Sequence, residues 1–313
     1  MKIIGKAGRE DIAIVYIAEM RNGLLTEFVE SVQPPIPREE KWVLIVSTLY
    51  GCPVKCKICD AGGTYKGKLS AHEIIEQIDF MVKNRFSNRK IPVPKFKIQF
   101  ARIGEPAFNN AVLEVLEKLP KLYDAPGLMV CISTIAPAGK DKFFAEMLKI
   151  KQKYYHGRFQ LQFSIHTTDE DLRNWFIPIN KWNFNSISDF GEVFYQDGDR
   201  KIALNFAPAE NMPIDENILL KYFNPNKFVI KITPVNPTLS AFRNKLISYI
   251  KTENEKYEII ERLKSAGYEV ILSIGELEEN KIGSNCGQYI NHYLNNKIKS
   301  EESYTYPILS IKN

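Results

Sequence analysis

Strand-like and helix-like segments alternate along the sequence, and this alternation limits the folds that the chain can adopt. The predicted strands are Lys41–Ser47, Lys95–Ala101, Leu128–Ser133, Phe159–Ile165, Lys201–Phe206, Phe228–Thr233 and Tyr268–Ile274. The first predicted helix begins at the capping-box pair Ser70 and Glu73. The other predicted helices cover Asn109–Leu119, Lys140–Tyr154, Asp215–Phe223 and Glu255–Ala266. Repeated β–α units predict an α/β fold with a parallel sheet inside and helices outside. Six or seven such units favour a partial (β/α)6 barrel of the TIM type.

The predicted strands alternate in polarity, which is unusual for a parallel sheet. Strands covered on both faces are normally apolar throughout. Here Leu161, Phe163 and Ile165 share one face, while the opposite face carries Gln160, Gln162, Ser164 and His166. The outer helices need the apolar face, and buried polar groups without partners are costly. The pattern therefore predicts a wet interior that holds a ligand, and the alternative is a half-exposed antiparallel sheet.

Composition excludes several classes of protein. The 313 residues are 44% hydrophobic and 12% aromatic, with a net charge of +5, which is typical of a folded chain rather than a disordered one. No apolar run approaches the roughly 18 residues of a membrane span, and the N-terminus lacks a signal-peptide stretch. We expect a cytoplasmic protein with no membrane partner. The predicted organisation is a strand-rich extension (1–41, with strands at Ile12–Ala18 and Glu27–Val32), a barrel (42–275) and a C-terminal segment (276–313).

Three of the five cysteines lie within eight residues, in the loop after the first barrel strand. Cys52, Cys56 and Cys59 have the spacing C-x3-C-x2-C. A disulfide framework would spread an even number of cysteines through a smaller chain, so the triplet indicates metal or cluster ligands. A structural zinc takes four ligands, and no fourth Cys or His stands nearby. Three thiolates on a four-iron cluster leave one iron open. The alternative is zinc with a distant fourth ligand.

The triplet resembles the signature of the radical S-adenosylmethionine (SAM) superfamily. The resemblance implies a [4Fe-4S] cluster whose open iron binds SAM, and an electron donor such as flavodoxin or ferredoxin. Reductive cleavage of SAM then gives a 5′-deoxyadenosyl radical, so the difficult chemistry belongs to the cofactor. One departure is Ile58, which stands where an aromatic residue is usual.

Further motifs narrow the resemblance to the RlmN/Cfr methyl synthases, which methylate adenine carbons in RNA. In order along the chain these motifs are Gly104-Glu-Pro106, Ile132-Ser-Thr134, Ser164-Ile-His166, Asp171-Leu-Arg173, Pro178-Ile-Asn-Lys181, Pro234-Val-Asn-Pro237 and Asn285-Cys-Gly-Gln288. The similar region runs from about Trp42 to His292. The resemblance assigns SAM contacts to Gly104, Glu105, Ser133, Ser164, Ile165, His166 and Asn236. Strand periodicity independently places Ser164 and His166 inside the barrel.

Cys286 has a second role in this resemblance. The family's cysteine in the Cys-Gly-Gln motif is methylated by one SAM, and the radical from a second SAM removes hydrogen from that methyl. The methylene radical then adds to an sp2 carbon of the substrate. The residues before Cys286, Glu276–Gly283, depart from the family's arginine-glycine-acidic stretch.

The chain also departs from the family at the cysteine that releases the covalent product. Aligned without gaps, Ile45 occupies that position, and isoleucine cannot act as a nucleophile. Either the adduct is resolved otherwise or the product differs. Glu30, in Val29-Glu-Ser-Val32, resembles the family's proton acceptor and is a candidate base. Cys131 is a second candidate, although core packing is the favoured interpretation for it.

The substrate class stays open between a small heterocycle, a nucleotide and an RNA. Residues 1–41 do not read as the helical RNA-binding domain of the family. One basic strip could meet phosphates, although a solvated loop is slightly favoured: it contains Lys83, Arg85, Arg89, Lys90, Lys95, Lys97 and Arg102. Two other hypotheses remain. One is a radical SAM enzyme without methyl transfer, in which Cys286 donates a hydrogen atom or crosslinks. The other is a non-catalytic nucleic-acid-binding Fe-S protein.

Overall fold

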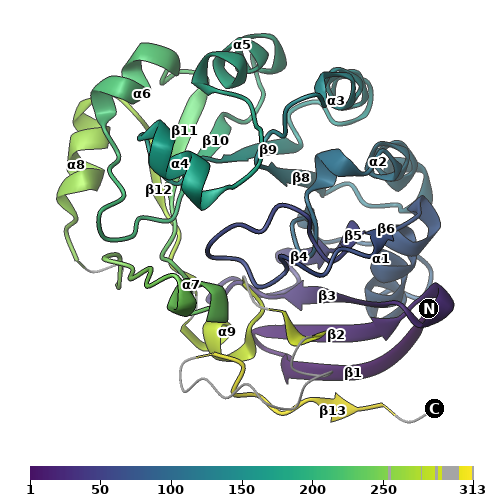
Figure 1. The fold of residues 1–313 in the computed structure, drawn as a ribbon. Coiled ribbons are helices and arrows are strands. Elements are labelled where there is room, and N and C mark those ends of the chain that lie inside the picture. Colours follow the sequence, from purple (N-terminus) through teal and green to yellow (C-terminus); the bar gives the residue numbers. More distant parts are fainter. Residues whose placement is uncertain (253–254, 276, 286–287, 291–302, 312–313) are drawn as a thin grey trace.

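A single curved sheet organises the molecule. The structure, a computed structural model, describes residues 1–252, 255–275, 277–285, 288–290 and 303–311. Its main sheet has eleven strands in the order β12-β11-β10-β9-β8-β7-β4-β3-β2-β1-β13. A separate two-stranded sheet pairs β5 (Leu49–Tyr50) with β6 (Gly67–Lys68). Figure 1 shows the strands arranged around a central space with helices on the outside. The predicted α/β class with a mostly parallel sheet is confirmed.

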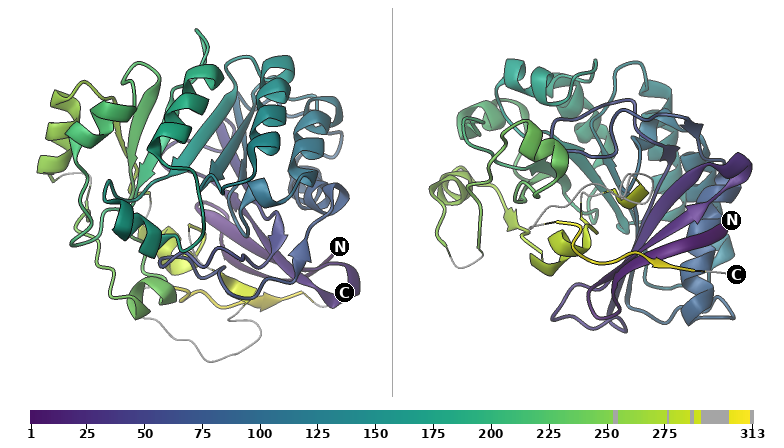
Figure 2. Two further views of the ribbon diagram at one scale, coloured as in Figure 1. Left: turned by 45° about the horizontal axis from the view of Figure 1, so that its top comes forward. Right: turned by 60° about the horizontal axis from the view of Figure 1, so that its bottom comes forward.

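The barrel half of the sheet is parallel from β4 to β12. Its strands are β4 (Lys41–Val46), β7 (Lys95–Phe100), β8 (Leu128–Thr134), β9 (Phe159–Ser164), β10 (Ile202–Phe206), β11 (Phe228–Ile232) and the short β12 (Val270–Leu272). The connecting helices are α1 (Ala71–Arg85), α2 (Ala111–Leu122), α3 (Asp141–Tyr154), α4 (Glu170–Phe176), α5 (Phe184–Phe194), α6 (Glu216–Tyr222), α7 (Leu239–Arg243) and α8 (Glu258–Ser265). Figure 2 shows helices covering the outer side of the parallel strands.

The N-terminal strands continue the barrel sheet in antiparallel pairing. These are β1 (Lys2–Arg9), β2 (Ala13–Glu19) and β3 (Leu25–Ser31), and β3 pairs with β4. The C-terminal strand β13 (Leu309–Ser310) pairs with β1 and so brings the two ends of the chain to one edge. Sequence analysis missed β1 because Gly5 and Gly8 interrupt its apolar pattern. A Cβ at Gly8 would lie 2.1 Å from the Ala13 carbonyl oxygen, so that position needs glycine.

The alternating polarity of the strands turns their apolar side chains toward the helices and their polar side chains inward, as the sequence predicts. Leu161, Phe163 and Ile165 are fully buried against the helices, whereas Gln160 and Gln162 face inward and are partly exposed. A second apolar cluster lies on the inner side of the sheet and includes Val15, Ile17 and Val29 from the N-terminal strands. The interior is therefore mixed, with an apolar wall from the N-terminal strands and a polar wall from β7 to β11. No helix among the described residues is long and apolar enough to cross a bilayer.

Some predicted boundaries are wrong by a few residues. Helix α2 extends to Leu122 although Pro120 lies in its last turn, and α8 begins at Glu258 rather than Glu255. Proline is tolerated there because the Leu116 carbonyl, which lacks an amide donor from residue 120, accepts from the Tyr155 hydroxyl instead. The predicted stop after α8 is confirmed, since Gly267 has φ +90°.

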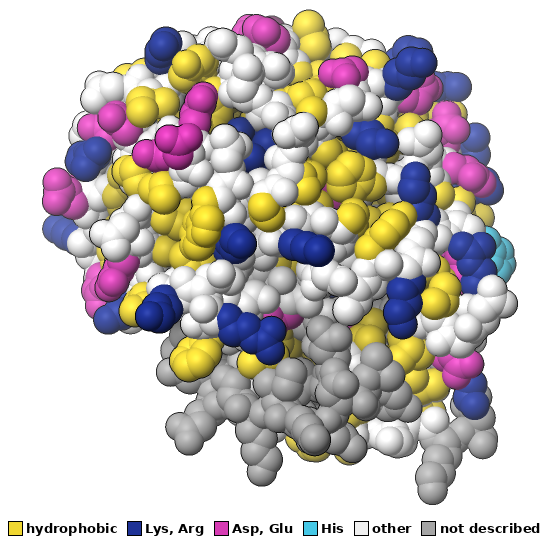
Figure 3. Space-filling model, viewed as in Figure 1, with side chains coloured by type: hydrophobic (Ala, Val, Ile, Leu, Met, Phe, Trp, Pro, Cys, Tyr) yellow, Lys and Arg dark blue, Asp and Glu magenta, His cyan; other side chains and the backbone are white. Residues whose placement is uncertain are grey.

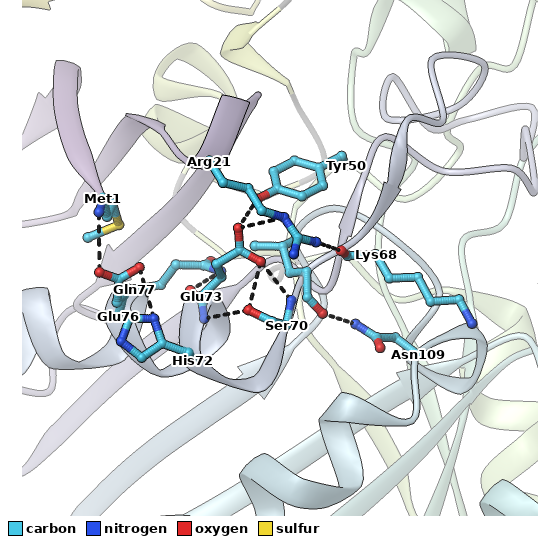
Figure 4. Close-up of polar contacts among 11 residues, drawn as sticks. Met1, Arg21, Tyr50, Lys68, Ser70, His72, Glu73, Glu76, Gln77 and Asn109 are labelled. Atoms are coloured by element: carbon cyan, nitrogen blue, oxygen red, sulfur yellow. Dashed lines mark hydrogen bonds and ion pairs between the residues drawn. The ribbon is translucent and has the colours of Figure 1, made fainter. Parts of the chain in front are cut away.

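A polar network fixes the start of α1 beneath the cysteine loop (Figure 4). The Ser70 hydroxyl accepts from the Glu73 amide at 3.3 Å, and Glu73 accepts from the Ser70 amide at 2.8 Å, which completes the predicted capping box. The Tyr50 hydroxyl donates to Glu73 at 2.6 Å, and Arg21 lies 3.3 Å from the same carboxylate. Tyr50 ends β5 (Leu49–Tyr50), two residues before Cys52. The cap therefore also anchors the strand that begins the cysteine loop.

Replacing Ser70 by alanine is expected to lower the free energy of unfolding by about 1 kcal/mol, because the Glu73 amide and carboxylate each lose a partner. Urea denaturation of the wild type and the variant would measure the change. Ser265→Ala, at an exposed position late in α8, is the matched control and should change stability by less than about 0.5 kcal/mol. Equal effects of the two substitutions would show that the cap contributes nothing.

Candidate functional site

The three cysteines of the triplet lie together on one tightly bonded loop. The Cys52 amide donates to the Ala61 carbonyl at 2.8 Å, and the Cys59 amide donates to the Cys56 carbonyl at 3.1 Å. Burial raises the pKa of the Cys56 thiol well above its usual value, and the neighbouring Cys59 and Cys52 sulfurs raise it further. The sulfurs are thus close enough to interact.

The donor chemistry of this loop fits an iron–sulfur cluster. Three soft thiolates within eight residues are typical ligands of such clusters. Within the residues described, no group of three or more His, Cys, Asp or Glu side chains has the geometry of a metal site. The fit of a cluster therefore rests on the identity and proximity of the thiols and not on preformed coordination.

The Gly104-Glu105 pair is separated from the end of β7 by three residues and packs against Leu49 of β5. Gly104 has φ +102°, and a Cβ there would lie 2.5 Å from the Leu49 Cγ. The Glu105 carboxylate accepts from the Thr134 hydroxyl at 2.5 Å and from the Ile135 and Ala107 amides at 2.9 and 3.0 Å. Burial raises the pKa of Glu105 to about 7, and these hydrogen bonds oppose the rise. Glu105 thus joins the end of β7 to the end of β8.

Inward-facing residues continue along the same edge of the sheet. Gln162 donates to the Ser133 hydroxyl at 3.3 Å, and Ser164 ends β9 next to Asn205 of β10. The Asn205 side-chain oxygen is buried and has no hydrogen-bond partner among the residues that the structure describes. A buried acceptor without a partner is costly, so this position fits contact with a polar ligand. The helix-side position of Ile165, by contrast, leaves only its backbone available to the interior.

His166 adopts a strained backbone conformation at the end of β9. Its φ is +68°, which is uncommon for a residue with a side chain and often marks functional sites. Burial and then the nearby Arg173 charge lower the pKa of His166 to about 3, so the imidazole is neutral. Its Nδ1 accepts from the Ala207 amide at 3.3 Å, which places the ring proton on Nε2. Neutral His166 can therefore donate one hydrogen bond.

Helix α7 and the residue before it contact the cysteine loop through hydrogen bonds. This segment follows Pro234-Val-Asn236-Pro237, and the Thr238 hydroxyl donates to the Ile58 carbonyl at 2.6 Å. The Ser240 amide donates to Asp60 at 2.8 Å. These bonds bring the segment after Asn236 to the loop that carries Cys56 and Cys59. Sequence analysis missed both α7 and Asp60; the only available signal was an acid directly after the third cysteine.

The C-terminal segment reaches the cysteine loop through Tyr304. Its hydroxyl donates to the Asp60 carboxylate at 2.6 Å and accepts from the Gln288 amide at 3.0 Å. Cys286 itself lies outside the described residues, but Gln288 stands only two positions after it. One buried hydroxyl therefore connects the residue after Cys59 with the neighbourhood of Cys286. No sequence signal marked Tyr304.

Glu30 does not lie where its predicted role as a base requires. It is 1% exposed and points to the helix side of β3, where it accepts from the Trp42 indole at 3.0 Å. It forms ion pairs with Arg85 and, at 3.2 Å, with Arg38. Its neighbour Val29 faces the interior and pairs with Ile45. The alternation of β3 thus turns Glu30 away from the interior.

Ile45 and Cys131 share one inward-facing row of the sheet. Ile45 pairs with Gln99, and Gln99 pairs with Cys131. Cys131 is 3% exposed, which agrees with the core-packing interpretation. The interior at the level of Ile45 therefore offers an aliphatic side chain in place of a thiol.

The predicted basic strip is partly neutralised. Lys83 and Arg89 pair with Asp79 at 3.1 and 2.6 Å, Arg85 pairs with Glu10 and Glu30, and Arg102 is buried. The carboxylates come from other segments or from just before the strip, so a local count of charges could not reveal them. The cationic residues of the strip are thus not a continuous phosphate-binding surface.

The fold has a counterpart among solved structures. No protein-family model matches the chain. It is similar to a crystal structure of a radical SAM methyltransferase from Sphaerobacter thermophilus, with a TM-score of 0.67 at 16% identity over 92% of this chain and 81% of the other. The two proteins therefore share a fold, and in this chain the cysteine triplet lies in the loop after β4 of that fold.

Curated proteins with similar sequences are RNA methyltransferases. The dual-specificity RNA methyltransferase RlmN of Wolinella succinogenes is 27% identical over 311 residues, covering 91% of this chain and 83% of the relative. RlmN of Helicobacter hepaticus is 27% identical over 296 residues, covering 92% and 72%. The chain is thus similar to RlmN methyltransferases over most of its length, in agreement with the resemblance of its motifs.

Gly104→Ala is expected to lower the free energy of unfolding by about 3 kcal/mol, because a Cβ adds both positive-φ strain and overlap with Leu49. Gly139→Ala is the matched control, since Gly139 has φ +74° and nothing within 4 Å of its Cβ position. That variant should lose only about 1 kcal/mol. Chemical denaturation measures both, and equal losses would contradict the close approach to Leu49.

Lys41→Met is expected to stabilise the protein at pH 7. Burial, followed by repulsion from Lys95, Lys97, Lys231 and Arg200, lowers the pKa of Lys41 to about 8 from 10.5. Between these values the unfolded chain binds more protons, so the native state of the wild type gains stability as pH rises from about 8 to about 10.5. The advantage of the variant should therefore be full below pH 8 and shrink above it, and salt should reduce it.

Thermal unfolding at several pH values and salt concentrations tests this prediction. Lys142→Met, at an exposed position, is the control and should have little effect. A Lys41→Met variant that is less stable than the wild type at pH 7 would show that the cations at this end of the barrel do not repel one another.

Proposed function

We propose that the chain transfers a SAM-derived carbon through Cys286 to an sp2 carbon of an RNA or nucleotide substrate. The observation that carries this proposal is the bridge made by Tyr304. Its hydroxyl bonds Asp60, next to Cys59, and Gln288, two residues after Cys286. A radical SAM enzyme that only cleaves SAM needs no cysteine on a second segment held against its cysteine loop. This arrangement supports a radical chemistry in which Cys286 takes part, and the similarity to RNA methyltransferases favours methyl transfer as that chemistry.

In this proposal Cys52, Cys56 and Cys59 hold a [4Fe-4S] cluster as thiolates. SAM lies against Gly104-Glu105, Ser133, the Ser164–His166 turn and Asn236. When bound and reduced by a flavodoxin- or ferredoxin-like donor, the cluster and SAM supply a 5′-deoxyadenosyl radical. The close approach of Gly104 to Leu49, the carboxylate of Glu105 and the donor Nε2 of His166 support these assignments.

Cys286 carries the methyl group in this scheme. Its thiolate takes a methyl from one SAM and becomes a thioether, and the radical removes one hydrogen atom from that methyl. The resulting carbon radical bonds to the sp2 carbon, which is too weak a nucleophile to attack SAM itself. Ile45 cannot supply the thiol that releases the product in the family, so release follows a route without a thiol at this position.

A cavity beside the cysteine loop supports a heterocyclic substrate. It has a volume of about 400 Å³ and lies between the N-terminal strands, the cysteine loop and residues 288–290. It is lined in part by Tyr50, Gly51, Lys66, Gln288 and Ile290. Ligand sites of several hundred cubic ångströms with mixed polar and apolar walls suit small planar molecules. A nucleobase placed here would stand near both cysteine-bearing segments.

The face around this loop carries unpaired cations, which support a phosphate-bearing substrate. Lys55, Lys57, Lys66 and Lys68 lie in the loop region, and within the described part of the chain none forms an ion pair. Figure 3 shows Lys and Arg side chains around the centre of the face and acidic side chains mainly toward its edges. Binding of a nucleic acid to this face would weaken with rising salt. These lysines, and not the partly neutralised strip, are the cationic residues that support RNA.

Anaerobic purification followed by a peptide mass spectrum across Cys286 tests the proposal. We expect a methyl group on Cys286 in the wild type and none in Cys56→Ala, which loses a cluster ligand. Cys131→Ala is the matched control, because it removes a buried cysteine outside the scheme and should keep the methyl on Cys286. SAM cleavage to 5′-deoxyadenosine is measured in the same preparations.

An unmodified Cys286 in a preparation that still cleaves SAM would contradict methyl transfer and favour a radical enzyme in which Cys286 donates hydrogen or crosslinks. A preparation that binds nucleic acid in a salt-dependent way but never cleaves SAM would favour the non-catalytic alternative.

A further inference from the structure

A buried ion pair connects the barrel to the segment that contains Cys286. Arg102 lies just before Gly104, and its side chain is 1% exposed. Its Nη2 stands 2.6 Å from the carboxylate of Glu27, a fully buried residue of β3. Sequence analysis counted Arg102 with the basic strip and gave Glu27 no role. The pair therefore needs its own explanation.

The two side chains bind the C-terminal segment on both sides of Cys286. Arg102 donates through Nη1 to the Ser284 carbonyl and through Nη2 to the Gly283 carbonyl, both at 2.9 Å. Glu27 accepts from the Ile290 amide through its other oxygen at 2.9 Å. The contacts fall two and three residues before Cys286 and four residues after it. One ion pair thus holds both ends of a short stretch with Cys286 between them.

The geometry suits arginine specifically. A guanidinium presents several donors in a rigid fork, so one side chain can donate to two adjacent carbonyls while its charge faces a carboxylate. An ammonium would share a single nitrogen among the three. Burial raises the pKa of Glu27, while the Arg102 charge opposes that rise. Buried ion pairs often add little net stability, so a positioning role explains the Arg102–Glu27 pair better than a contribution to stability does.

We propose that Arg102 and Glu27 are positioning residues that hold the Cys286-bearing segment over the Gly104-Glu105 loop. Arg102 is two residues from Gly104, so the same short loop faces SAM in the proposed function and grips the segment that carries the methyl. The role assigned to Cys286 rests on that function; the anchoring of residues 283–290 does not. Weakening the pair should release the segment and separate SAM cleavage from methyl transfer.

Hydrogen–deuterium exchange of the full-length, cluster-loaded protein tests the anchoring. The variants are Arg102→Met, Arg102→Lys and the double variant Glu27→Gln/Arg102→Met, which leaves no unpaired buried charge. Peptides covering 277–290 report the segment, and peptides covering β8 (128–134) report the sheet. Arg262→Met, which breaks the partly exposed pair between Arg262 of α8 and Glu216 of α6, is the matched control.

We expect exchange over 277–290 to speed up at least tenfold in Arg102→Met and in the double variant, with β8 unchanged and Arg102→Lys intermediate. In the same proteins, methyl occupancy of Cys286 should fall at least tenfold while 5′-deoxyadenosine formation stays within twofold. A purely structural arginine would move both activities together.

Unchanged exchange over 277–290, or acceleration shared equally by β8 in every variant, would overturn the anchoring. Accelerated exchange with methyl occupancy and SAM cleavage falling equally would overturn the positioning role. If wild-type Cys286 carries no methyl, the proposed function fails, and the exchange result still decides whether the pair anchors the segment.

Discussion

The structure depends on where the strands of the barrel can place their polar side chains. Helices α1 to α3, α5, α6 and α8 cover the outside of the sheet, so the apolar residues of β7 to β11 must face outward. Gln99, Gln160, Gln162, Ser133 and Asn205 are consequently left inside. Such side chains are stable in an interior only with hydrogen-bond partners. Some of these pair with one another, whereas the side-chain oxygen of Asn205 has no partner within the described part of the chain. The fold therefore builds an interior that suits a polar ligand at the ends of its strands.

Two segments from outside the parallel strands complete that interior. The cysteine loop is anchored before Cys52 by the bond from Tyr50 to Glu73, and around Cys59 by the bonds with α7 and its N-cap. The C-terminal segment is joined to it by Tyr304 and to the barrel by Arg102 and Glu27. These links are buried and polar, so each depends on its neighbours being in place. Chemistry that uses one cysteine loop to generate a radical and another cysteine to carry carbon requires this kind of coupling.

Much of the fold could be predicted from the sequence because local signals agree with it. The alternation of Gln160 to Ile165, the capping box at Ser70 and the stop at Gly267 each reflect short-range physics. The cysteine spacing likewise identified the loop and the class of enzyme. The predictions that were wrong or missing depend on contacts between residues that are distant in the sequence. The inward or outward direction of Glu30 depended on its register against β4, and the carboxylates that neutralise the basic strip come from distant segments. The contacts of Tyr304 with Asp60, and of Arg102 with the C-terminal segment, form only in the folded chain. No local sequence pattern predicts them.

The central claim is that the cysteine loop and the Cys286-bearing segment serve one site. An oxygen-free crystal structure of the cluster-loaded protein with SAM would test it most directly. We expect the cluster on Cys52, Cys56 and Cys59, SAM along the ends of β7 to β9, and Cys286 facing SAM with the Tyr304 and Arg102 contacts intact. A structure with SAM bound and those contacts present, but with Cys286 turned to solvent on the far side of its segment, would contradict the account.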